Sequence, residues 1–317
     1  MSRDPSDVGR RRWLRESTAL VLGVTVAAWG LRAAAASINP GSASASAGAA
    51  AGASAGASAA VPPGRVVVIG GALGEIVYAL GCEGRLVGTD TTCTFPPAVR
   101  ALPKIGYQRT VSAESLLALR PDLVLASAEA GPPTALDQVR QAGVRVELFA
   151  ERHDPSSTRD KITGMAAALG AQAAGRALAA KFDHDWARAM ATAAPPPLRV
   201  LFVMDPVGRQ PMVAGRHTGA DAMLRYAGVT NVIGDADGYK VLTSEALVAA
   251  QPDVVLTTDD TLQAVGGPAR LLATAGFSLT PAGRASRVVS LDSLFLLGFG
   301  PRMPEAVIAL RRRLAAA

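Results

Sequence analysis

VSAESLLALRPDLVL, from Val111 to Leu125, decides the fold because the chain repeats it as LTSEALVAAQPDVVL, from Leu242 to Leu256. In each copy a serine or threonine precedes an apolar helical stretch, Pro-Asp ends it, and an apolar strand follows. The copies are too distant for a solenoid, so they predict two duplicated α/β domains. Aligned without gaps, the identical positions are Glu114/Glu245, Leu116/Leu247, Ala118/Ala249, Pro121/Pro252, Asp122/Asp253, Val124/Val255 and Leu125/Leu256.

Each copy lies in a half of the chain that opens with a buried strand. The first half begins with β-branched residues from Arg65 to Ile69 and a glycine turn, and a helix is expected from about Leu73 to Leu80. The second half begins with a strand from Arg199 to Met204. The glycines at 70–74 lack the G-x-G-x-x-G order of a dinucleotide loop, so a tight turn is the better interpretation.

An alanine-rich stretch bounded by Gly170 and Pro195 joins the two halves. It can form ~24 helical residues, ~36 Å long, which would act as a stiff spacer. A plain packing helix within one domain is the alternative, and the duplication on either side argues against it. The predicted fold is therefore α/β, with two Rossmann-like lobes joined by a single long backbone helix and a ligand cleft between them. We expect an N-terminal lobe over 65–168, the backbone helix over 169–196 and a C-terminal lobe over 197–317.

The N-terminus is expected to be a targeting segment rather than part of the fold. Arg10-Arg11-Arg12-Trp13-Leu14 precedes an apolar run from Ser17 to Leu31, which resembles a twin-arginine export signal. The run is about 15 residues, shorter than the ~20 needed to span a bilayer, although an uncleaved anchor is the alternative. We expect a signal peptide over 1–36 and a Gly/Ala/Ser-rich linker over 37–64. The chain would then be periplasmic.

Composition excludes several classes of function. The chain has 317 residues, 49% of them hydrophobic, which suits about two globular domains. Half of the net charge of +6 lies before residue 65, and there are no basic runs interleaved with aromatics, so nucleic-acid binding is not expected. No G-x-S-x-G, H-E-x-x-H or paired-cysteine zinc motif is present, so we do not expect an enzyme.

A glycine-tyrosine pair precedes each copy of the repeat, and the two pairs align when a one-residue gap is allowed. Gly106-Tyr107 is followed by Arg109, and Gly238-Tyr239 by Lys240. Ligands of open α/β sheets bind at the loops beyond the carboxyl ends of the strands, so both tyrosines and both cations would face one cleft. A phenolate can ligate ferric iron and a cation can pair with a carboxylate, and haem offers both partners. The alternative is that Tyr107 only packs its ring while Arg109 is solvated.

Five segments together resemble the haem-binding periplasmic proteins of bacterial ABC importers, of the helical-backbone class that also serves siderophores and cobalamin. They are GGALGEIVYALGCEGRLVGTDTTCTFPP, LPKIGYQRTVSAESLLALRPDLVLAS, VAGRHTGADAMLRYAG, DGYKVLTSEALVAAQPDVVL and AGRASRVVSLDSLFLLGFGPRMPEAV. The resemblance covers essentially Arg65 to Leu314. It implies a monomeric receptor that captures haem and passes it to a permease and its ATPase. A receptor of the same fold for a ferric siderophore or cobalamin is the alternative.

The resemblance also implies roles for particular residues. Tyr107 would be the axial ligand of the haem iron, with Arg109 supporting the tyrosinate or a propionate. The arginine that many relatives place before the second-lobe Leu-x-x-x-Gly-Gly segment is missing here, since that region reads Asp259-Asp260-Thr261-Leu262, so Lys240 or Arg216 would substitute.

Some relatives supply a histidine as second axial ligand near the strand that contains Met204, and this chain has none there. His217 is the nearest candidate, with Met204 behind it, and a surface or capping role for His217 is the alternative. We assign no ligand role to His153 or His184.

Two further predictions concern docking and the cysteines. Glu75 matches a family position that docks on permease arginines, and Asp221 is a candidate for the second lobe. A glutamate in a first helical turn often only complements the helix dipole. Cys82 and Cys93 lie within one lobe and could form one disulfide in an exported protein, or remain free.

Overall fold

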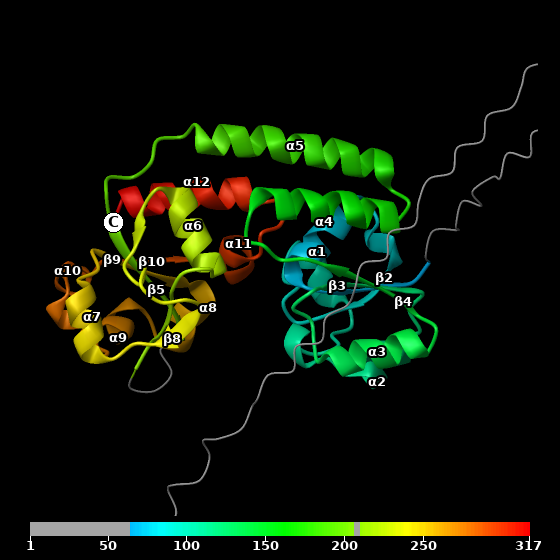
Figure 1. Ribbon diagram of the computed structural model, residues 1–317, viewed down its shortest axis with the longest axis horizontal. Coiled ribbons are helices and arrows are strands. Elements are labelled where there is room, and N and C mark those ends of the chain that lie inside the picture. Colours follow the sequence, from blue (N-terminus) through cyan, green and yellow to red (C-terminus); the bar gives the residue numbers. More distant parts are fainter. Residues whose placement is uncertain (1–63, 206–209) are drawn as a thin grey trace, which may run out of the picture. The chain divides into compact units, whose positions relative to one another are not determined.

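The computed structural model describes residues 64–205 and 210–317 of the chain (Figure 1). The predicted signal peptide and the predicted linker up to residue 63 lie outside the described residues. Within the described ranges, every helix is too short or too polar to cross a membrane.

A four-stranded parallel sheet forms the N-terminal lobe, in the order β2-β1-β3-β4. Its strands are β1 (Val66–Ile69), β2 (Leu86–Thr89), β3 (Leu123–Ser127) and β4 (Arg145–Phe149). Helices α1 (Gly71–Ala79) and α4 (Pro155–Ala168) contribute to a core that contains Val66 and Val68. Helices α2 (Ala113–Ala118) and α3 (Pro133–Gln141) contribute to a second core that contains Val67 and Ile69. Because strand residues alternate between faces, the apolar run of β1 serves both cores.

The C-terminal lobe has a mixed sheet in the order β10-β9-β5-β6-β8, and β7 also pairs with β5. Strands β5, β9 and β10 are parallel, whereas β6 runs antiparallel to β5 and β8. The strands are β5 (Arg199–Asp205), β6 (Met212–Ala214), β7 (Thr230–Asn231), β8 (Tyr239–Val241), β9 (Val254–Thr258) and β10 (Val288–Leu291). The helices are α6 (Gly219–Ala227), α7 (Ser244–Ala250), α8 (Asp259–Ala264), α9 (Pro268–Leu272), α10 (Pro281–Arg284), α11 (Ser293–Leu297) and α12 (Met303–Ala315).

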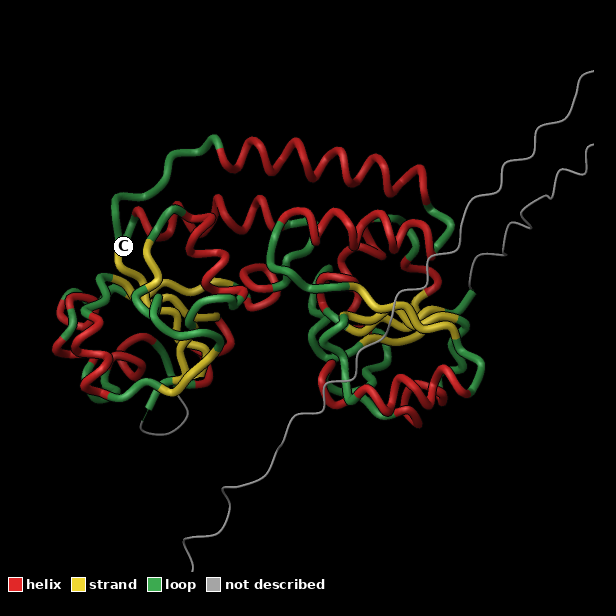
Figure 2. Tube along the Cα trace, in the orientation of Figure 1, coloured by secondary structure: helices red, strands yellow, loops and turns green. Residues whose placement is uncertain are grey.

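The backbone helix is α5 (Gln172–Met190), which runs beside α4 of the first lobe and α12 of the second (Figures 1 and 2). Its 19 residues are fewer than the sequence suggested, and it is ~28 Å long. Arg311 fastens its C-terminal end, donating to the carbonyl oxygens of Ala189 at 2.8 Å and Thr192 at 2.7 Å. The predicted fold of two α/β lobes joined by one long helix is confirmed, and α5 is packed along both lobes as well as connecting them.

The two copies of the repeat make the same hydrogen bonds in the two lobes. Ser112 caps α2 and Thr243 caps α7, as predicted. The repeated aspartates fasten the first strand of each lobe: Asp122 accepts from the Arg65 backbone N–H at 2.9 Å, and Asp253 accepts from that of Arg199 at 2.9 Å. These matched contacts show that the two lobes share one local architecture.

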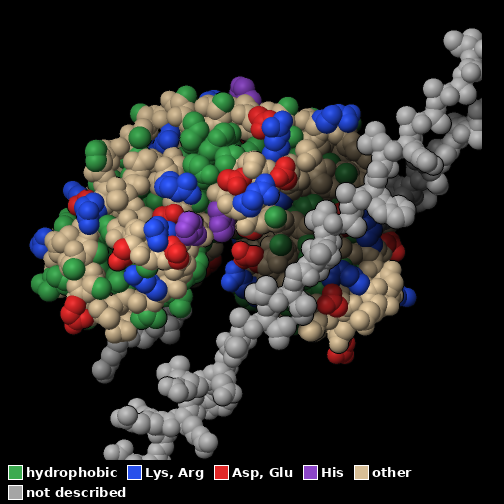
Figure 3. All heavy atoms as spheres, viewed as in Figure 1, with side chains coloured by type: hydrophobic (Ala, Val, Ile, Leu, Met, Phe, Trp, Pro, Cys, Tyr) green, Lys and Arg blue, Asp and Glu red, His purple; other side chains and the backbone are tan. Residues whose placement is uncertain are grey.

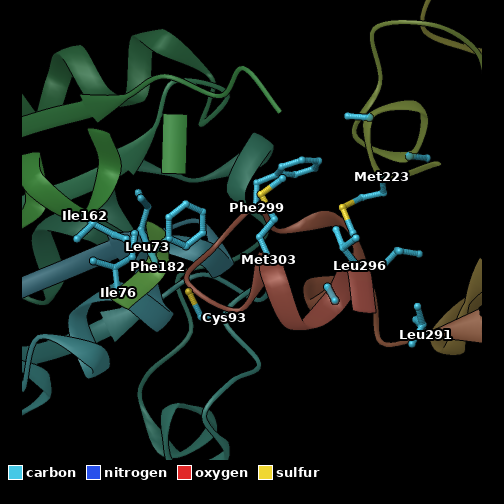
Figure 4. Close-up of a cluster of buried hydrophobic side chains, with 14 of the residues drawn as sticks. Leu73, Ile76, Cys93, Ile162, Phe182, Met223, Leu291, Leu296, Phe299 and Met303 are labelled. Atoms are coloured by element: carbon cyan, nitrogen blue, oxygen red, sulfur yellow. The ribbon is translucent and has the colours of Figure 1, made fainter. Parts of the chain in front are cut away.

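One apolar core extends from the first lobe into the second through the segment that joins α11 to α12. Figure 4 shows Leu73, Ile76 and Phe182 on one side, Met223 and Leu291 on the other, and Phe299 and Met303 between them. Thr158 of α4 donates to the Phe299 carbonyl oxygen at 2.9 Å, which ties this segment to the first lobe. The two lobes are therefore connected by a continuous packed core.

Candidate functional site

A cleft of about 810 Å³ lies between the two lobes. Residues from both lobes line it, and many of them follow the carboxyl end of a parallel strand: Gly70 after β1, Glu129 after β3, Glu151 and His153 after β4, Asp260 after β9 and Asp292 after β10. Such strand ends are where open α/β sheets bind ligands. In Figure 3 the surface is hollowed between the two halves, with two histidine side chains at the edge of the hollow.

Tyr107 enters the cleft from the loop between β2 and α2. Gly106 precedes it with φ of 103°, a conformation that favours glycine and sets the direction in which the chain presents the tyrosine. Tyr107 is 46% exposed and lines the cleft, so its ring and hydroxyl are open to a ligand there. The position therefore suits contact with a ligand better than a packing role.

Arg109 lines the cleft beside Tyr107 and forms an ion pair with Glu129. Glu129 follows β3, and its own backbone N–H donates to Ser127 Oγ at 3.2 Å. Glu129 was not among the site residues predicted from the sequence. The repeat could have indicated it, because Glu129 and Asp260 occupy the same position after the strands β3 and β9, and both line the cleft.

Tyr239 of β8 lines the cleft from the second lobe. Burial raises the pKa of Tyr239 to about 12, while the charge of Arg109 lowers it and that of Glu129 raises it. Arg109 and Glu129, whose charges shift the pKa of Tyr239, belong to the first lobe, so charges of one lobe act on a cleft residue of the other. At neutral pH the Tyr239 hydroxyl stays protonated and can donate a hydrogen bond.

Lys240 and Arg216 do not line the cleft. Lys240 follows Tyr239 on a strand, so its side chain points to the opposite face, and its ammonium group lies 3.7 Å from Asp235. Arg216 pairs with Asp237 at 3.0 Å. Neither occupies the position expected for a residue that supports the tyrosinate or a propionate, and Arg109 is the one candidate of that group in the cleft lining.

Three candidate iron ligands other than tyrosine line the cleft. His217 and Met204, both expected from the sequence, are there, and the His217 Nε2 lies 3.6 Å from Asp237. His153, to which no role was assigned, also lines the cleft, and its ring lies 5.0 Å from that of Phe299. Both histidines have positive φ, 55° for His153 and 61° for His217. The sequence could have indicated that His153 lines the cleft, because it lies just after the carboxyl end of a strand, β4.

Glu75, which the sequence resemblance assigned to docking, is buried and paired within the chain. Its carboxylate is 6% exposed and forms an ion pair with Arg302, whose guanidinium stacks on the ring of Phe95 at 3.6 Å. Burial raises the pKa of Glu75, and Arg302 partly offsets that effect. In this arrangement the Glu75 carboxylate makes its ion pair within the chain and is little exposed.

Asp221 is also engaged within the lobe. It accepts from Asn231 Nδ2 at 3.0 Å and lies 3.7 Å from Arg225. Its carboxylate thus serves the packing of α6 against β7 in the structure.

Cys82 and Cys93 are both buried free thiols, so they do not form the disulfide that the sequence allowed. Cys93 Sγ lies 3.2 Å from Asp90 Oδ1, and burial raises the pKa of this thiol well above its usual value. The described residues contain no cluster of three or more His, Cys, Asp or Glu that could hold a metal ion.

Several solved structures with similar folds are periplasmic heme-binding proteins. The protein BhuT, in complex with two hemes, is 61% identical over 80% of this chain and 98% of its own, with a TM-score of 0.77. RhuT from Roseiflexus sp. RS-1 is 40% identical over 80% of this chain and 98% of its own, with a TM-score of 0.77. These neighbours confirm the resemblance that the sequence motifs indicated.

Among curated relatives, the vitamin B12-binding protein of Vibrio cholerae is 25% identical over 62% of this chain and 71% of its own length. The family model described as "Periplasmic binding protein" matches residues 66–294. Its members bind substrates for transport, which agrees with the prediction that the chain is not an enzyme. Because the family model matches residues 66–294, most of the chain, this chain belongs to the periplasmic binding protein family.

Proposed function

We propose that this chain captures haem in the cleft between its lobes, through a bond from the Tyr107 phenolate to the ferric iron. The observation that supports this most is the exposed ring of Tyr107 in a cleft where Arg109 is the neighbouring cation. Coordination to Fe(III) and a nearby positive charge both stabilise a phenolate that would otherwise be protonated at pH 7. The heme-binding neighbours, one of them 61% identical, point to the same ligand.

The two tyrosines of the repeat differ in their suitability as iron ligands. Tyr107 precedes Arg109 by two residues, whereas the cation that follows Tyr239 points away from the cleft to Asp235. The raised pKa of Tyr239 makes its phenolate unfavourable. We therefore assign the iron to Tyr107, and assign to Tyr239 a neutral hydroxyl and a ring that contacts the ligand.

The cleft could accept a second haem. Its volume of about 810 Å³ lies toward the upper end of ligand pockets, which are typically ~300–1,000 Å³. His217 and Met204 lie on the wall of the second lobe, where a second iron would need a ligand, and BhuT was solved with two hemes. We propose His217 first, because imidazole is the commoner iron ligand.

A receptor for cobalamin is the alternative ligand class. It is favoured by the vitamin B12-binding relative, at 25% identity. In cyanocobalamin both axial positions of the cobalt are already occupied, so a tyrosinate bond is not needed. The spectrum of the bound complex therefore separates the two ligands.

The experiment is a titration of the protein with hemin, followed by absorbance, with Tyr107→Phe and the matched variant Tyr239→Phe. We expect saturable binding with a tyrosinate-type ferric spectrum that Tyr107→Phe loses and Tyr239→Phe keeps. Loss of that spectrum only in Tyr239→Phe would assign the iron to the other lobe. No saturable binding by the wild type, together with binding of cyanocobalamin, would favour the alternative.

We also propose that the receptor is exported by the twin-arginine route, acts as a monomer, and delivers its ligand to the permease and ATPase of an ABC importer. The carboxylates that fit such docking are Glu114 and Glu245, which are exposed in the first turns of α2 and α7 and identical across the repeat. A matched pair on the two lobes could engage a two-subunit permease symmetrically. Glu114→Lys with Glu245→Lys should abolish uptake while hemin binding is retained, and unchanged uptake would refute this docking pair.

A further inference from the structure

The charges that line the cleft are mostly negative. Among the described residues of its lining, the carboxylates of Glu129, Glu151, Asp260 and Asp292 accompany a single arginine or lysine, Arg109. Glu151 is neutralised by the buried ammonium group of Lys161, at 2.7 and 3.0 Å from its two oxygens. Among the described residues of the lining, a ligand with two carboxylates would therefore meet one cation, Arg109, together with the carboxylates of Glu129, Asp260 and Asp292.

Arg109 is already paired with the protein's own carboxylate. Its guanidinium donates to Glu129 in an ion pair in which both side chains remain substantially exposed, 57% for Arg109 and 38% for Glu129. Backbone hydrogen bonds hold the two loops together, because the Gly131 N–H donates to the Gln108 carbonyl oxygen at 2.9 Å and the Val111 N–H donates to that of Gly131 at 2.8 Å. Glu129 is thus fixed beside Arg109 by the fold.

We propose, on the basis of the function proposed above, that Glu129 is a specificity-determining residue that competes with the carboxylates of haem for Arg109. A guanidinium pairs best with one carboxylate in a planar, two-bond arrangement. A ligand carboxylate must therefore displace Glu129 from Arg109 or share the cation with it. Glu129 therefore reduces the difference in affinity between a ligand ring that bears carboxylates and the same ring without them. Selectivity then depends mainly on the iron and the ring.

The repeat supplies a matched control for this competition. Asp260 occupies the position of Glu129 in the second lobe, lines the same cleft and accepts from Ser293 Oγ at 2.6 Å. Asp260→Asn removes the same charge from the cleft without releasing Arg109. A second control is Glu147→Gln, which breaks the exposed ion pair with Arg145 on β4, outside the cleft lining.

The test compares the dissociation constants of hemin and hemin dimethyl ester for the wild type and these variants at low salt. We expect Glu129→Gln to tighten hemin binding about fivefold and to leave the ester within about twofold, since exposed charge pairs have modest energies. Asp260→Asn should tighten hemin by less than about twofold, and Glu147→Gln should change neither ligand. The gain should disappear in Arg109→Gln/Glu129→Gln and shrink at high salt, because salt screens exposed charges.

Two results would overturn the proposal. Equal gains for Glu129→Gln and Asp260→Asn would mean that only the net charge of the cleft matters. Weaker binding of both hemin and its ester by Glu129→Gln would mean that Glu129 orients Arg109 instead of competing for it. Failure of the proposed function is a separate outcome, since it would appear as no tyrosinate spectrum in the wild type before any variant is compared.

Discussion

Arg302→Met is expected to destabilise the protein by about 3–4 kcal/mol at pH 7.5, because it leaves the Glu75 carboxylate buried without its cation. The pair joins α1 of the first lobe to the start of α12, with the Arg302 Nε 3.0 Å from Glu75 Oε2. Side-chain exposures are 5% for Glu75 and 22% for Arg302, so water only partly replaces the lost partner. Breaking a buried pair costs about 3–5 kcal/mol, and the exposure of Arg302 favours the lower end. Loss of its stacking on Phe95 adds about 0.5–1 kcal/mol.

The loss should depend on pH in a defined direction. Burial raises the pKa of Glu75 and Arg302 lowers it, so removing Arg302 raises the pKa further. Between the unfolded and the raised native value, the native protein binds more protons than the unfolded chain. Stability therefore falls as pH rises through that window. Arg302→Met should lose less stability at pH 5 than at pH 7.5.

The assay is urea unfolding followed by circular dichroism at both pH values, for the wild type, Arg302→Met, Glu75→Gln and the double variant. The double variant should recover at least half of the loss, since it removes the buried charge as well. In thermal unfolding the single variant should melt about 6–12 °C lower. Arg145→Met, which breaks an exposed pair with Glu147, should cost less than about 1 kcal/mol. A loss of under about 1 kcal/mol for Arg302→Met, or an equal loss at both pH values, would refute the reasoning.

Three further predictions follow from contacts elsewhere. Gly71→Ala should lower the free energy of unfolding by about 2 kcal/mol and weaken hemin binding, because the new Cβ would lie 2.5 Å from Leu294 Cδ1 and 2.6 Å from the Thr92 carbonyl oxygen. The control is Gly84→Ala, whose Cβ would enter open space. It should change neither urea unfolding nor the hemin titration. Lys161→Met should lower the free energy of unfolding in urea by about 3 kcal/mol, because it leaves Glu151 without its cation. The double variant Lys161→Met/Glu151→Gln should recover most of that stability. No recovery would mean that the loss came from packing and not from charge. Reduction with dithionite should weaken hemin capture at least about tenfold because tyrosinate favours ferric iron, and equal affinity in both oxidation states would count against the Tyr107 ligand.

Much of the fold could be predicted because it depends on local patterns. The caps at Ser112 and Thr243, the Pro-Asp stops and the apolar strands that follow them all act within a few residues of the chain. The internal repeat added the long-range information, since it indicated that two lobes of one architecture were present. The length of α5 was overestimated because alanine-rich sequence favours helix up to the prolines at 195–197, whereas the helix ends at Met190.

The site could be predicted in part. Tyr107 and Arg109 were recognised because they lie in a short motif. Strand alternation could have excluded Lys240, which follows Tyr239 and must face the other side of β8. The ion pair of Glu75 could not have been predicted, because its partner Arg302 is 227 residues away in the chain and only the folded structure brings them together.

The continuous core at Phe299 and Met303 also bears on how quickly a ligand is captured. Separating the lobes would expose these side chains to water, so the walls of the cleft are held in place before any ligand arrives. The ordering of the site is completed during folding, and little conformational entropy remains to be lost on binding. Association should then be set by diffusion and electrostatic steering, and differences in affinity among variants should appear mainly in the rate at which the ligand leaves.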